Sequence, residues 1–599
     1  MQMNARTIYA VLAEAADSYK DASALHQPLG KGKYRTYSWA EYHVAVQEIA
    51  CGLRRLGIGK GDIIALHSET RAEFYLADLG VMANGSIAAA LYTSYPLPDQ
   101  IRNLRASAPR AIFAENPETM RALIEAAGEP ALAARWFLLT GEAEGAVTLE
   151  QVRAEGRQAL AEDPQAFEKI RSEVSADDQA ILYLTSGATG EPKMGYATHR
   201  ALVANVDMGP TAFPLSTSDS TIGFLPSAHI AQRVVIELLP IGMGAAVWFS
   251  EGLSKLPNEI KTIRPTFLLA PPRVWERIFA SIHTEIKKRS ALSQKLFHGA
   301  VGLGAEVSRL REEGKPVPQW MQTTLKVAER VVFSKIRTRL GGRIRIAASG
   351  AAPLGKELAR FYSAIGMPLI EGYGLTEGGV VCLNPLDRPK SGSIGVALPG
   401  VELRLAEDGE LLVKSEALFS GYHNDPESTA MVLRDGWLYT GDIAEIDPDG
   451  YVFITGRKKE LIVSSNGKKI YPARIEGLFK TEPIVSQIVL IGDRLPYVTA
   501  LFTLNMSNVE TLKGVESAKT EPAKLAAAPP VLDEVRKAVA RVNKQLAPFE
   551  QIRKFRVLAQ DFSIETGELT PTMKVRRSRV LENNRELVSE LYMGREESQ

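Results

Sequence analysis

Short apolar runs alternate with amphipathic stretches along the first half of the chain. Ile63–His67 and Ile87–Tyr92 are strand-length apolar runs, and Glu73–Met82 between them has helical spacing. The same alternation continues to Ala111–Ala114 and returns between residues 220 and 270. Strands that alternate with helices are typical of βαβ units, so we predict largely parallel sheets.

The pattern changes further along the chain. From Pro272 to Leu340 the sequence is helical and basic, which favours a solvated helix face and leaves open a surface that meets acidic lipid headgroups. Short alternating strands from Val401 to Val413 indicate an antiparallel, barrel-like piece, and after Thr455 the pattern is that of a small α/β unit. We therefore predict an α/β protein. Its large N-terminal domain (residues 1–455) holds the βαβ-type parallel sheets and the barrel-like piece, and its small mobile α/β domain covers residues 456–599.

Composition narrows the class of protein. A chain of 599 residues is too long for one compact core, and 45% apolar with 24% charged residues is typical of a soluble globular protein. A net charge of +1 gives no electrostatic case for nucleic acid. The two cysteines, Cys51 and Cys382, lack metal-type spacing and fit a reducing compartment.

Targeting signals are also missing from the sequence pattern. The N-terminal stretch has acidic residues and no apolar core, so it does not resemble a secretory leader. No apolar run reaches the roughly 18 residues that a membrane span needs. We expect a cytoplasmic protein. Peripheral contact with the inner membrane face and oligomerisation both stay open.

The richest candidate chemistry lies in residues 181–199, which read ILYLTSGATGEPKMGYATH. The β-branched run Ile181–Leu184 predicts a buried strand, and a loop rich in glycine and hydroxyl groups follows it. Glycines let a backbone approach a ligand closely, and free N–H groups, hydroxyls and a lysine suit a triphosphate. Lys193 is not preceded by Gly or followed by Ser or Thr, so the loop is not a Walker A motif. Alone, the loop is equally consistent with a polar turn.

Four further motifs follow this loop along the chain. They are Glu371-Gly372-Tyr373-Gly374-Leu375-Thr376-Glu377, Tyr439-Thr440-Gly441-Asp442, Gly456-Arg457-Lys458-Lys459-Glu460 and Pro571-Thr572-Met573-Lys574. Together the five motifs resemble those of the acyl-adenylate-forming superfamily, which includes acyl-CoA synthetases, luciferases and peptide-synthetase adenylation domains. They stand in the family's order and near its spacing, and the resemblance covers almost the whole chain.

The resemblance implies a site for ATP and Mg²⁺. The β- and γ-phosphates would be cradled by Thr185, Ser186, Gly187, Thr189, Gly190 and Lys193. Thr376 would bond the α-phosphate, while Thr185 and Glu377 would face Mg²⁺, for which a carboxylate is a suitable hard ligand. The competing interpretation of Thr376 is a helix-capping residue.

On the nucleoside side, the resemblance assigns Gly350, Ala351, Glu371, Gly372, Tyr373, Gly374, Asp442 and Arg457. The ring of Tyr373 could stack on adenine, and the Asp442 carboxylate could accept both ribose hydroxyls. Arg457 is a fork-shaped donor suited to phosphate or ribose. A turn aspartate and a surface ion pair are the plainer alternatives.

The small domain carries the remaining implied roles. Lys459 occupies the family's hinge position, and Gly467 with Lys468 belongs to a loop that in relatives lines the tunnel for the pantetheine of coenzyme A. Lys574 would bridge the attacking carboxylate and the α-phosphate, where a long, compact cation can neutralise developing charge. Its alternative is one lysine of a basic cluster.

The acyl side is implied by His229, which matches a position beside the acyl site, and by the helix predicted from Ala231, whose apolar residues could line a tunnel. Pro272–Ile278 and the helical insert after it resemble bacterial long-chain ligases. The resemblance thus implies a ligase of fatty acid metabolism that activates a long-chain fatty acid with ATP and transfers it to coenzyme A, releasing AMP and pyrophosphate. An adenylating ligase for a medium-chain or aromatic acid stays open, as does an inactive lipid-binding relative.

Overall fold

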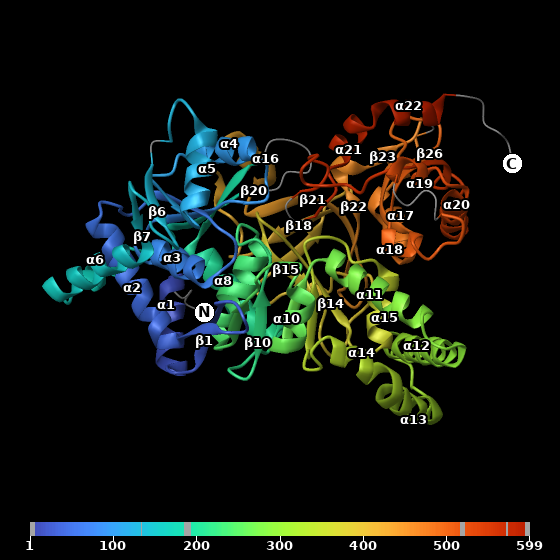
Figure 1. Ribbon diagram of the computed structural model, residues 1–599, viewed down its shortest axis with the longest axis horizontal. Coiled ribbons are helices and arrows are strands. Elements are labelled where there is room, and N and C mark those ends of the chain that lie inside the picture. The colour runs from blue at the N-terminus through green and yellow to red at the C-terminus, as the bar shows by residue number, and fades with distance from the viewer. Residues whose placement is uncertain are drawn as a thin grey trace.

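An eight-stranded sheet organises the first half of the molecule (Figure 1). The computed structural model describes residues 6–132, 134–184, 193–465, 467–515, 521–570 and 573–593. In spatial order the strands are β19 (Gly421–Tyr422), β9 (Met194–Thr198), β8 (Gln179–Leu184), β4 (Ile87–Ala90), β3 (Ile63–His67), β5 (Ala111–Ala114), β6 (Arg135–Leu138) and β7 (Ala146–Thr148). From β8 to β7 the strands pair in parallel, while β9 and β19 are antiparallel additions at one edge. The βαβ prediction is confirmed.

Helices connect the strands of this sheet and pack on it or on one another. They are α1 (Ile8–Tyr19), α2 (Trp39–Arg55), α3 (Ala72–Ala83), α4 (Leu97–Ser107), α5 (Pro117–Ala127), α6 (Leu149–Glu162), α7 (Ala166–Ser172) and α8 (His199–Ala212). Helix α2 begins at a capping box, in which Ser38 and Glu41 satisfy each other's backbone N–H groups. Helices α2 and α6 pack closely where they cross at Gly156. Any side chain there would clash, since a Cβ on Gly156 would lie 1.8 Å from the Glu48 carbonyl oxygen.

Two smaller sheets continue the N-terminal part. One is built from β10 (Ser220–Gly223), β11 (Ala246–Phe249), β1 (Ser23–Pro28) and β2 (Tyr34–Ser38). The other has β12 (Phe267–Ala270), β13 (Ile346–Ser349), β14 (Leu369–Leu375), β15 (Gly379–Leu383) and β16 (Val396–Ala397). Helices α10 (Leu256–Ile263) and α15 (Lys356–Ala364) join their strands.

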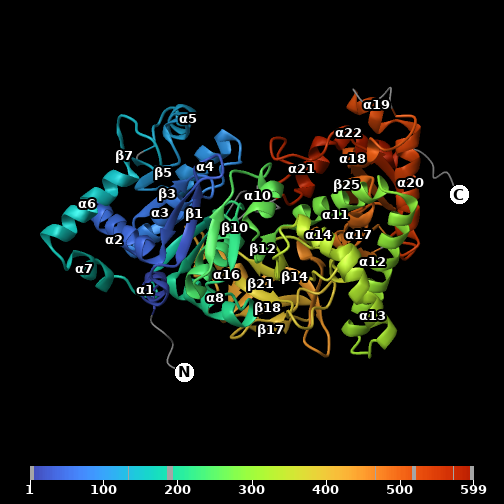
Figure 2. The same ribbon diagram turned by 60° about the horizontal axis from the view of Figure 1, so that its bottom comes forward.

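The predicted barrel-like piece is an antiparallel sheet, in the lower middle of Figure 2. Its strands are β17 (Glu402–Leu405), β18 (Glu410–Lys414), β21 (Trp437–Ile446), β20 (Leu433–Arg434) and β22 (Val452–Arg457), and helix α16 (Pro426–Val432) precedes β20. The prediction of short antiparallel strands is confirmed.

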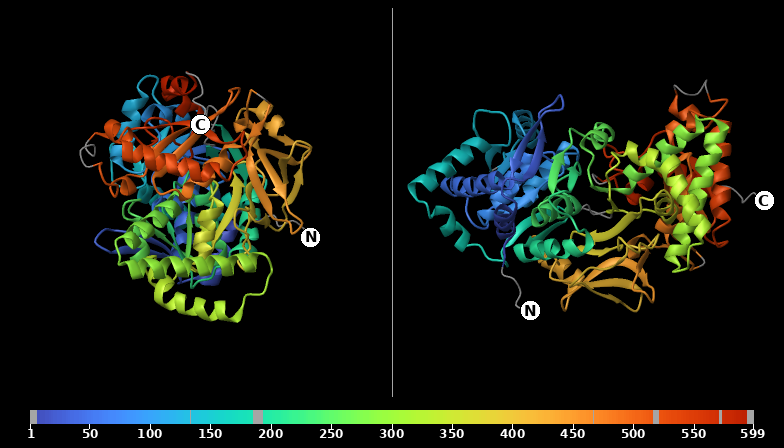
Figure 3. Two further views of the ribbon diagram at one scale, coloured as in Figure 1. Left: turned by 90° about the vertical axis from the view of Figure 1, so that its right-hand side faces the viewer. Right: turned by 90° about the horizontal axis from the view of Figure 1, so that it is seen from below.

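The basic stretch from residue 272 to 340 is helical, as predicted. It forms α11 (Pro272–Lys287), α12 (Ala291–Glu312), α13 (Gln319–Ala328), the π-helical turn η2 (Glu329–Phe333) and α14 (Ser334–Arg339). Trp275 anchors α11, because its buried indole N–H donates to the carbonyl oxygens of Ala270 and Ala348 at 3.1 and 3.2 Å. Helices α12 and α13 project from the body of the molecule (Figures 1 and 3).

The C-terminal part has a buried core of its own, which includes Ile475, Phe502 and Val531. Its strands are β23 (Ile462–Val463), β24 (Lys469–Ile470), β25 (Val485–Ile491), β26 (Val498–Leu504) and β27 (Ile552–Val557). Its helices are α17 (Pro472–Leu478), α18 (Met506–Val509), α19 (Pro522–Ala526), α20 (Pro529–Asn543), α21 (Arg577–Asn583) and α22 (Arg585–Tyr592), with 3₁₀ turns η3 (Lys458–Glu460) and η4 (Phe479–Thr481). Among the described helices, none combines the length and the apolarity that crossing a membrane requires.

Two polar contacts hold the C-terminal part against helix α11. Arg273 donates to the Ser486 carbonyl oxygen at 2.6 Å, and Lys480 Nζ lies 3.3 Å from a Glu276 carboxylate oxygen. Lys480 also donates to the carbonyl oxygen of Pro353. Charged side chains therefore contribute to the contact between the two parts.

The segment after residue 231 differs from the sequence prediction. It forms a π-helix, η1 (Gln232–Leu238), followed by α9 (Leu239–Met243), and every residue of η1 is buried. The predicted helix is therefore present with a π-helical start, and its polar residues Gln232, Arg233 and Glu237 are buried together with its apolar ones. Arg233 forms an ion pair with Asp78 of α3, and both side chains are at most 1% exposed.

This buried polar cluster is incompletely satisfied. Both Glu237 carboxylate oxygens lack a hydrogen-bond partner among the described residues, as do Arg233 Nε and Nη1. Burial raises the pKa of both Asp78 and Glu237, and the Arg233 cation opposes this rise. π-Helical turns inside proteins frequently mark functional positions.

Removing the carboxyls of this cluster should cost far more stability than breaking a surface pair. The double variant Asp78→Ala/Glu237→Gln leaves the Arg233 cation buried without a carboxylate, which typically costs about 3–5 kcal/mol. Arg121→Ala, which breaks the exposed Arg121–Glu118 pair, should cost about 1 kcal/mol or less. Chemical denaturation, followed through the unfolding of the N-terminal part, measures the loss of stability in both variants. Equal midpoints for the two variants would contradict the account.

Candidate active site

Three strands bring Tyr373, Asp442 and Arg457 into one connected group. Asp442 on β21 and Arg457 on β22 are register partners, and Tyr373 lies on β14. The Tyr373 hydroxyl donates to Asp442 Oδ2 at 2.5 Å, and Arg457 Nε donates to Asp442 Oδ1 at 2.9 Å. Asp442 is only 2% exposed.

The electrostatics of this group follow from the buried Asp442 carboxylate at its centre. The Asp442 carboxylate raises the pKa of Arg457, so the guanidinium stays charged. Burial, reinforced by Asp442, raises the pKa of Tyr373 well above its usual value, so its hydroxyl remains a donor. A carboxylate offers about four lone-pair positions, so two remain beyond the two that Tyr373 and Arg457 occupy.

A second group links Glu377 to Lys193. The Tyr422 hydroxyl donates to Glu377 Oε1 at 2.7 Å, and Lys193 Nζ lies 4.9 Å from the centroid of the same ring. Lys193 also donates to the Ser428 hydroxyl and lies 3.5 Å from Asp425 Oδ2. Burial and Glu377 raise the pKa of Tyr422, which keeps it protonated.

Sequence reasoning missed Tyr422, Asp425 and Ser428. A local signal was present, because Asp425-Pro426 opens helix α16 and the Asp425 side chain accepts from the Ser428 N–H at 2.9 Å. That signal predicts a helix start. It does not predict that the start faces Lys193, since the two segments are far apart in the chain.

The donor set around Glu377 fits a magnesium ion. One carboxylate oxygen receives the Tyr422 hydroxyl, and the other has no hydrogen bond among the described residues. Within the described residues, no group of three or more His, Cys, Asp or Glu side chains could hold a metal by itself. Mg²⁺ commonly binds through one or two carboxylates together with phosphate oxygens, so a single glutamate suits it.

Five of the predicted phosphate-cradle residues lie outside the described part of the chain. They are Thr185, Ser186, Gly187, Thr189 and Gly190. Their roles, including that of Thr185 toward Mg²⁺, stay predictions.

The loop after β13 is supported from the neighbouring strand. Glu371 of β14 accepts from the Leu354 N–H at 2.9 Å, and burial raises the pKa of this carboxyl to about 7. Ala351 has a φ of 70°, which is uncommon for a residue with a Cβ and costs strain. A Cβ on Gly350 would lie 3.6 Å from the Gly372 carbonyl oxygen. Glu371 therefore holds the predicted adenine-side loop in place.

The glycines of the β14 motif are explained by the hairpin that β14 forms with β15. A Cβ on Gly374 would lie 2.5 Å from the Gly379 carbonyl oxygen, and one on Gly372 would lie 2.8 Å from Leu383. At Gly374 the neighbour is backbone, so only glycine allows the approach, whereas at Gly372 the end of the Leu383 side chain would have to shift. Thr376 lies half-buried in the turn that joins the two strands, directly before Glu377.

Lys574 approaches both groups from the C-terminal part. Burial first, and then the Arg457 cation, lower the pKa of Lys574 to about 8, while the Asp442 and Glu377 carboxylates oppose the shift. These charges therefore lie within electrostatic reach of the lysine. The backbone beside it is fixed, because the Lys574 N–H donates to the Thr570 hydroxyl at 3.0 Å.

His229 lies in the same electrostatic environment. Burial and the Lys574 cation lower the pKa of His229 to about 3. Its Nδ1 accepts from the Ala231 N–H at 3.1 Å, which fixes the ring at the start of the π-helix. The imidazole is therefore neutral at ordinary pH.

The predicted hinge and tunnel residues lie at the surface. Lys459 is exposed in η3, next to Lys458, whose ammonium lies 2.5 Å from Asp408 and 3.0 Å from Glu410. Lys468 is exposed, with Nζ 5.8 Å from the Phe549 ring centroid, and Gly467 has a φ of 72°. Their roles stay predictions.

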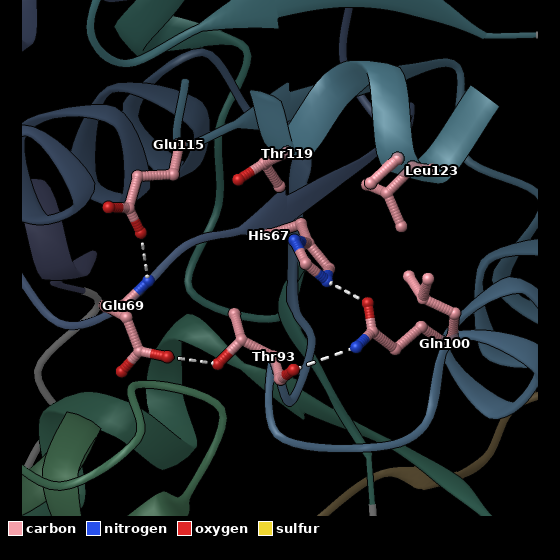
Figure 4. A pocket seen from close by; sticks show the side chains of 9 residues that line it. His67, Glu69, Thr93, Gln100, Glu115, Thr119 and Leu123 are labelled. Atoms are coloured by element: carbon pink, nitrogen blue, oxygen red, sulfur yellow. Dashed lines mark hydrogen bonds between the residues drawn. The ribbon is translucent and has the colours of Figure 1, made fainter. Parts of the chain in front are cut away.

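A polar pocket of about 270 Å³ opens elsewhere, at the carboxyl ends of β3 and β5 (Figure 4). It is lined by His67, Glu69, Thr93, Leu97, Gln100, Glu115, Thr119, Ala122 and Leu123. Its polar groups largely pair with one another. His67 Nε2 lies 2.6 Å from Gln100 Oε1, and the Glu69 N–H donates to Glu115 at 2.8 Å. Sequence reasoning singled out none of these residues.

Comparison with known families identifies the class of protein. Residues 12–423 match the AMP-binding enzyme family, and residues 459–596 match the AMP-binding enzyme C-terminal domain. The chain therefore belongs to the AMP-binding, adenylate-forming enzymes, and it is a ligase that uses ATP. This confirms the superfamily resemblance drawn from the five motifs.

Individual relatives support this assignment. The chain is 33% identical to the long-chain-fatty-acid–CoA ligase FadD15 of Mycobacterium tuberculosis, over 95% of this chain and 94% of that protein. It is 29% identical to fatty acyl-CoA synthetase A of Dictyostelium discoideum, over 98% and 90% of the two chains.

Solved structures show the same fold. The adenylation domain of a carboxylate reductase from Mycobacterium chelonae superposes with a TM-score of 0.74 at 23% identity, over 98% of this chain and 91% of that one. The anthranilate CoA ligase AuaEII, solved with anthranoyl-AMP, gives 0.74 at 19% identity, over 99% of both chains. At such identities the likeness concerns the fold alone.

The environment of His229 predicts a histidine that does not titrate between pH 5 and 8 (about the range in which unperturbed histidines gain their proton). Because burial and Lys574 lower its pKa to about 3, the ring should stay neutral across that range. Histidine-selective NMR, with His229→Gln to assign the signal among the eight histidines, measures this. A midpoint near 6.5, the unperturbed value, would contradict the described environment.

Proposed function

We propose that the chain is a long-chain fatty-acid–CoA ligase of fatty acid and lipid metabolism. The observation that carries the proposal is the convergence of Lys574 with Glu377, Asp442 and Arg457 from separate parts of the chain. Support for the acyl substrate comes from relatives of 33% identity over almost the whole chain whose names state this activity.

In the first step a fatty carboxylate attacks the α-phosphorus of ATP. A new C–O–P linkage forms, the bond to the β-phosphate oxygen breaks, and pyrophosphate leaves with the electron pair. Lys574 neutralises charge that builds on the carboxylate and the α-phosphate, and Thr376 donates to that phosphate. Lys193 and the loop before it hold the outer phosphates. A magnesium ion bound at Glu377 would add positive charge at those phosphates.

The nucleoside would lie against the Tyr373–Asp442–Arg457 group. The Tyr373 ring offers a face for adenine, and the free lone pairs of Asp442 accept the ribose hydroxyls. Gly350 and Ala351 supply the other side of the adenine site, and Glu371 keeps their loop in position through Leu354.

In the second step the C-terminal domain, residues 456–599, rotates about Lys459. The rotation withdraws Lys574 and brings the loop with Gly467 and Lys468 toward the acyl-adenylate. The thiolate of coenzyme A then attacks the acyl carbonyl, a thioester forms, and AMP leaves. The polar contacts across the boundary between the domains support such a motion. We place this activity in the cytoplasm.

One observation favours a second candidate, a ligase for a medium-chain or aromatic acid. The π-helix that follows His229 presents the buried Asp78–Arg233–Glu237 cluster where the sequence predicted an apolar tunnel lining. A polar obstacle one or two turns below His229 would shorten the acyl site. An inactive lipid-binding relative is less favoured, because such a protein has no need to retain Lys574, Glu377 and Asp442 together.

Acids of increasing length distinguish these candidates. Each buried methylene contributes roughly 0.8 kcal/mol, so kcat/KM should rise about fourfold per methylene and favour acids of roughly 12 to 18 carbons. Pyrophosphate release with and without coenzyme A measures adenylation and transfer separately. A preference for benzoate or an eight-carbon acid (roughly the length at which burial would stop) would support the second candidate and leave adenylation intact.

Lys574→Ala should slow adenylation by about a hundredfold or more, since it removes one charge that stabilises the transition state. Conversion of pre-formed acyl-adenylate to thioester should be spared. ATP–pyrophosphate exchange measures the first step, and Lys544→Ala, an exposed lysine of the same domain, is the matched control.

The pH dependence follows from the same lysine. Its pKa of about 8 means that the cation is present below that value and is lost above it, so kcat/KM for exchange should fall as pH rises through about 8. Lys574→Arg should move this fall to higher pH. An exchange rate in Lys574→Ala equal to that of the wild type would remove Lys574 from the mechanism.

A further inference from the structure

Helix α13 and the turn η2 that continues it carry apolar side chains into solvent. Trp320, Val327 and Val331 are 64%, 58% and 47% exposed. Their spacings of seven and four residues return to the same side of a helix, so they form one stripe. The adjoining face of the same helix, one residue further along the chain at each turn, buries Met321 and Ala328 against the body. Singly exposed apolar residues are common, but an aligned stripe of this kind is not.

Basic side chains accompany this stripe. Lys326 and Arg330 run alongside it, and Lys335 continues it into α14. All three are exposed, and none takes part in an ion pair with the residues the structure describes. Their charges are therefore available to a partner outside the chain.

The wider region is strongly positive. Residues 287–345 contain 14 Lys and Arg but four Glu and no Asp, whereas the whole chain has a net charge of only +1. Some of these cations are neutralised locally, as Arg309 is by Glu306 and Glu313. The concentration of positive charge on one projecting helical hairpin indicates an anionic partner.

We propose that the face formed by Trp320, Val327, Val331, Lys326, Arg330 and Lys335 binds the headgroup region of an anionic lipid bilayer. Tryptophan and aliphatic side chains enter the boundary between headgroups and acyl chains, while Lys and Arg meet the lipid phosphates. The attachment is peripheral. The projection of α12 and α13 from the body lets a flat surface reach this face (Figures 1 and 3).

Two other partners fit the face less well. A nucleic acid would bind the basic residues through its phosphates, but it would leave the stripe of Trp and Val without a binding role. A second copy of the chain would bring one positive face against another, which is repulsive. The inference goes beyond the proposed ligase activity and does not depend on which acid is activated.

Vesicle sedimentation tests the proposal with the full-length protein. The wild type should bind vesicles of equal parts phosphatidylcholine and phosphatidylglycerol, bind phosphatidylcholine alone far more weakly, and lose binding as salt is raised. The triple variant Lys326→Gln/Arg330→Gln/Lys335→Gln should weaken binding about a hundredfold, because each basic residue at an anionic surface contributes about fivefold.

Matched control variants change the same amount of charge, or remove an equally exposed apolar side chain, at positions away from the proposed face. Arg494→Gln/Lys513→Gln/Lys544→Gln removes the same charge from exposed positions of the C-terminal part and should bind as the wild type does. Trp320→Ala should weaken binding, while Leu29→Ala, at a residue 66% exposed elsewhere, should not. ATP–pyrophosphate exchange in the absence of lipid should be unchanged in all four, which shows that they are folded.

Several results would overturn the proposal. Equal binding by the two triple variants would remove the face from lipid recognition. Equal binding to neutral and anionic vesicles would do the same. Stronger binding to a double-stranded DNA than to the anionic vesicles would assign the face to nucleic acid. A dimer that Trp320→Ala dissociates, without vesicle binding by the wild type, would assign it to self-association.

Discussion

The site depends on the buried carboxylate of Asp442. It is held by the Tyr373 hydroxyl and the Arg457 guanidinium, and thereby joins β14, β21 and β22. The same carboxylate, with Glu377, opposes the desolvation that lowers the pKa of Lys574. Without these anions the pKa of Lys574 would fall further, and the cation that the proposed chemistry needs would be lost at a lower pH. The protonation of Lys574, which the C-terminal part carries, thus depends on the Asp442 and Glu377 carboxylates of the N-terminal part.

Much of this arrangement could be predicted from the sequence. The apolar runs gave the parallel sheet, because strands buried on both faces need continuous apolar residues, and the glycine-rich and charged motifs pointed to an adenylating enzyme. The sequence could not predict which residues that are far apart in the chain contact one another in the fold. Tyr422 lies beside Glu377, and Leu354 is held by Glu371, through folding contacts that local patterns do not encode. Gly374 was assigned to the ligand, although the hairpin with β15 already requires it.

The largest departure from the sequence prediction is the π-helix after His229. Helical periodicity marked a helix there, but periodicity does not distinguish a π-helix from an α-helix, nor does it show which polar residue is buried. The cluster of Asp78, Arg233 and Glu237 is sealed between η1 and α3 with polar atoms unpaired, an arrangement that costs stability. Arg233 and Glu237 follow His229 closely along the chain, so in the proposed function this cluster is the feature to vary when the length of the acyl substrate is tested.

We propose that the described arrangement of the two parts is the adenylating one and that transfer to coenzyme A requires another. Glu276 and Lys480 face each other across the boundary at 3.3 Å, and the native cysteines are buried, so Glu276→Cys and Lys480→Cys can be joined by a short bis-maleimide. The joined protein should retain ATP–pyrophosphate exchange and lose acyl-CoA formation, while the unjoined double variant performs both. Full acyl-CoA formation by the joined protein would contradict the account.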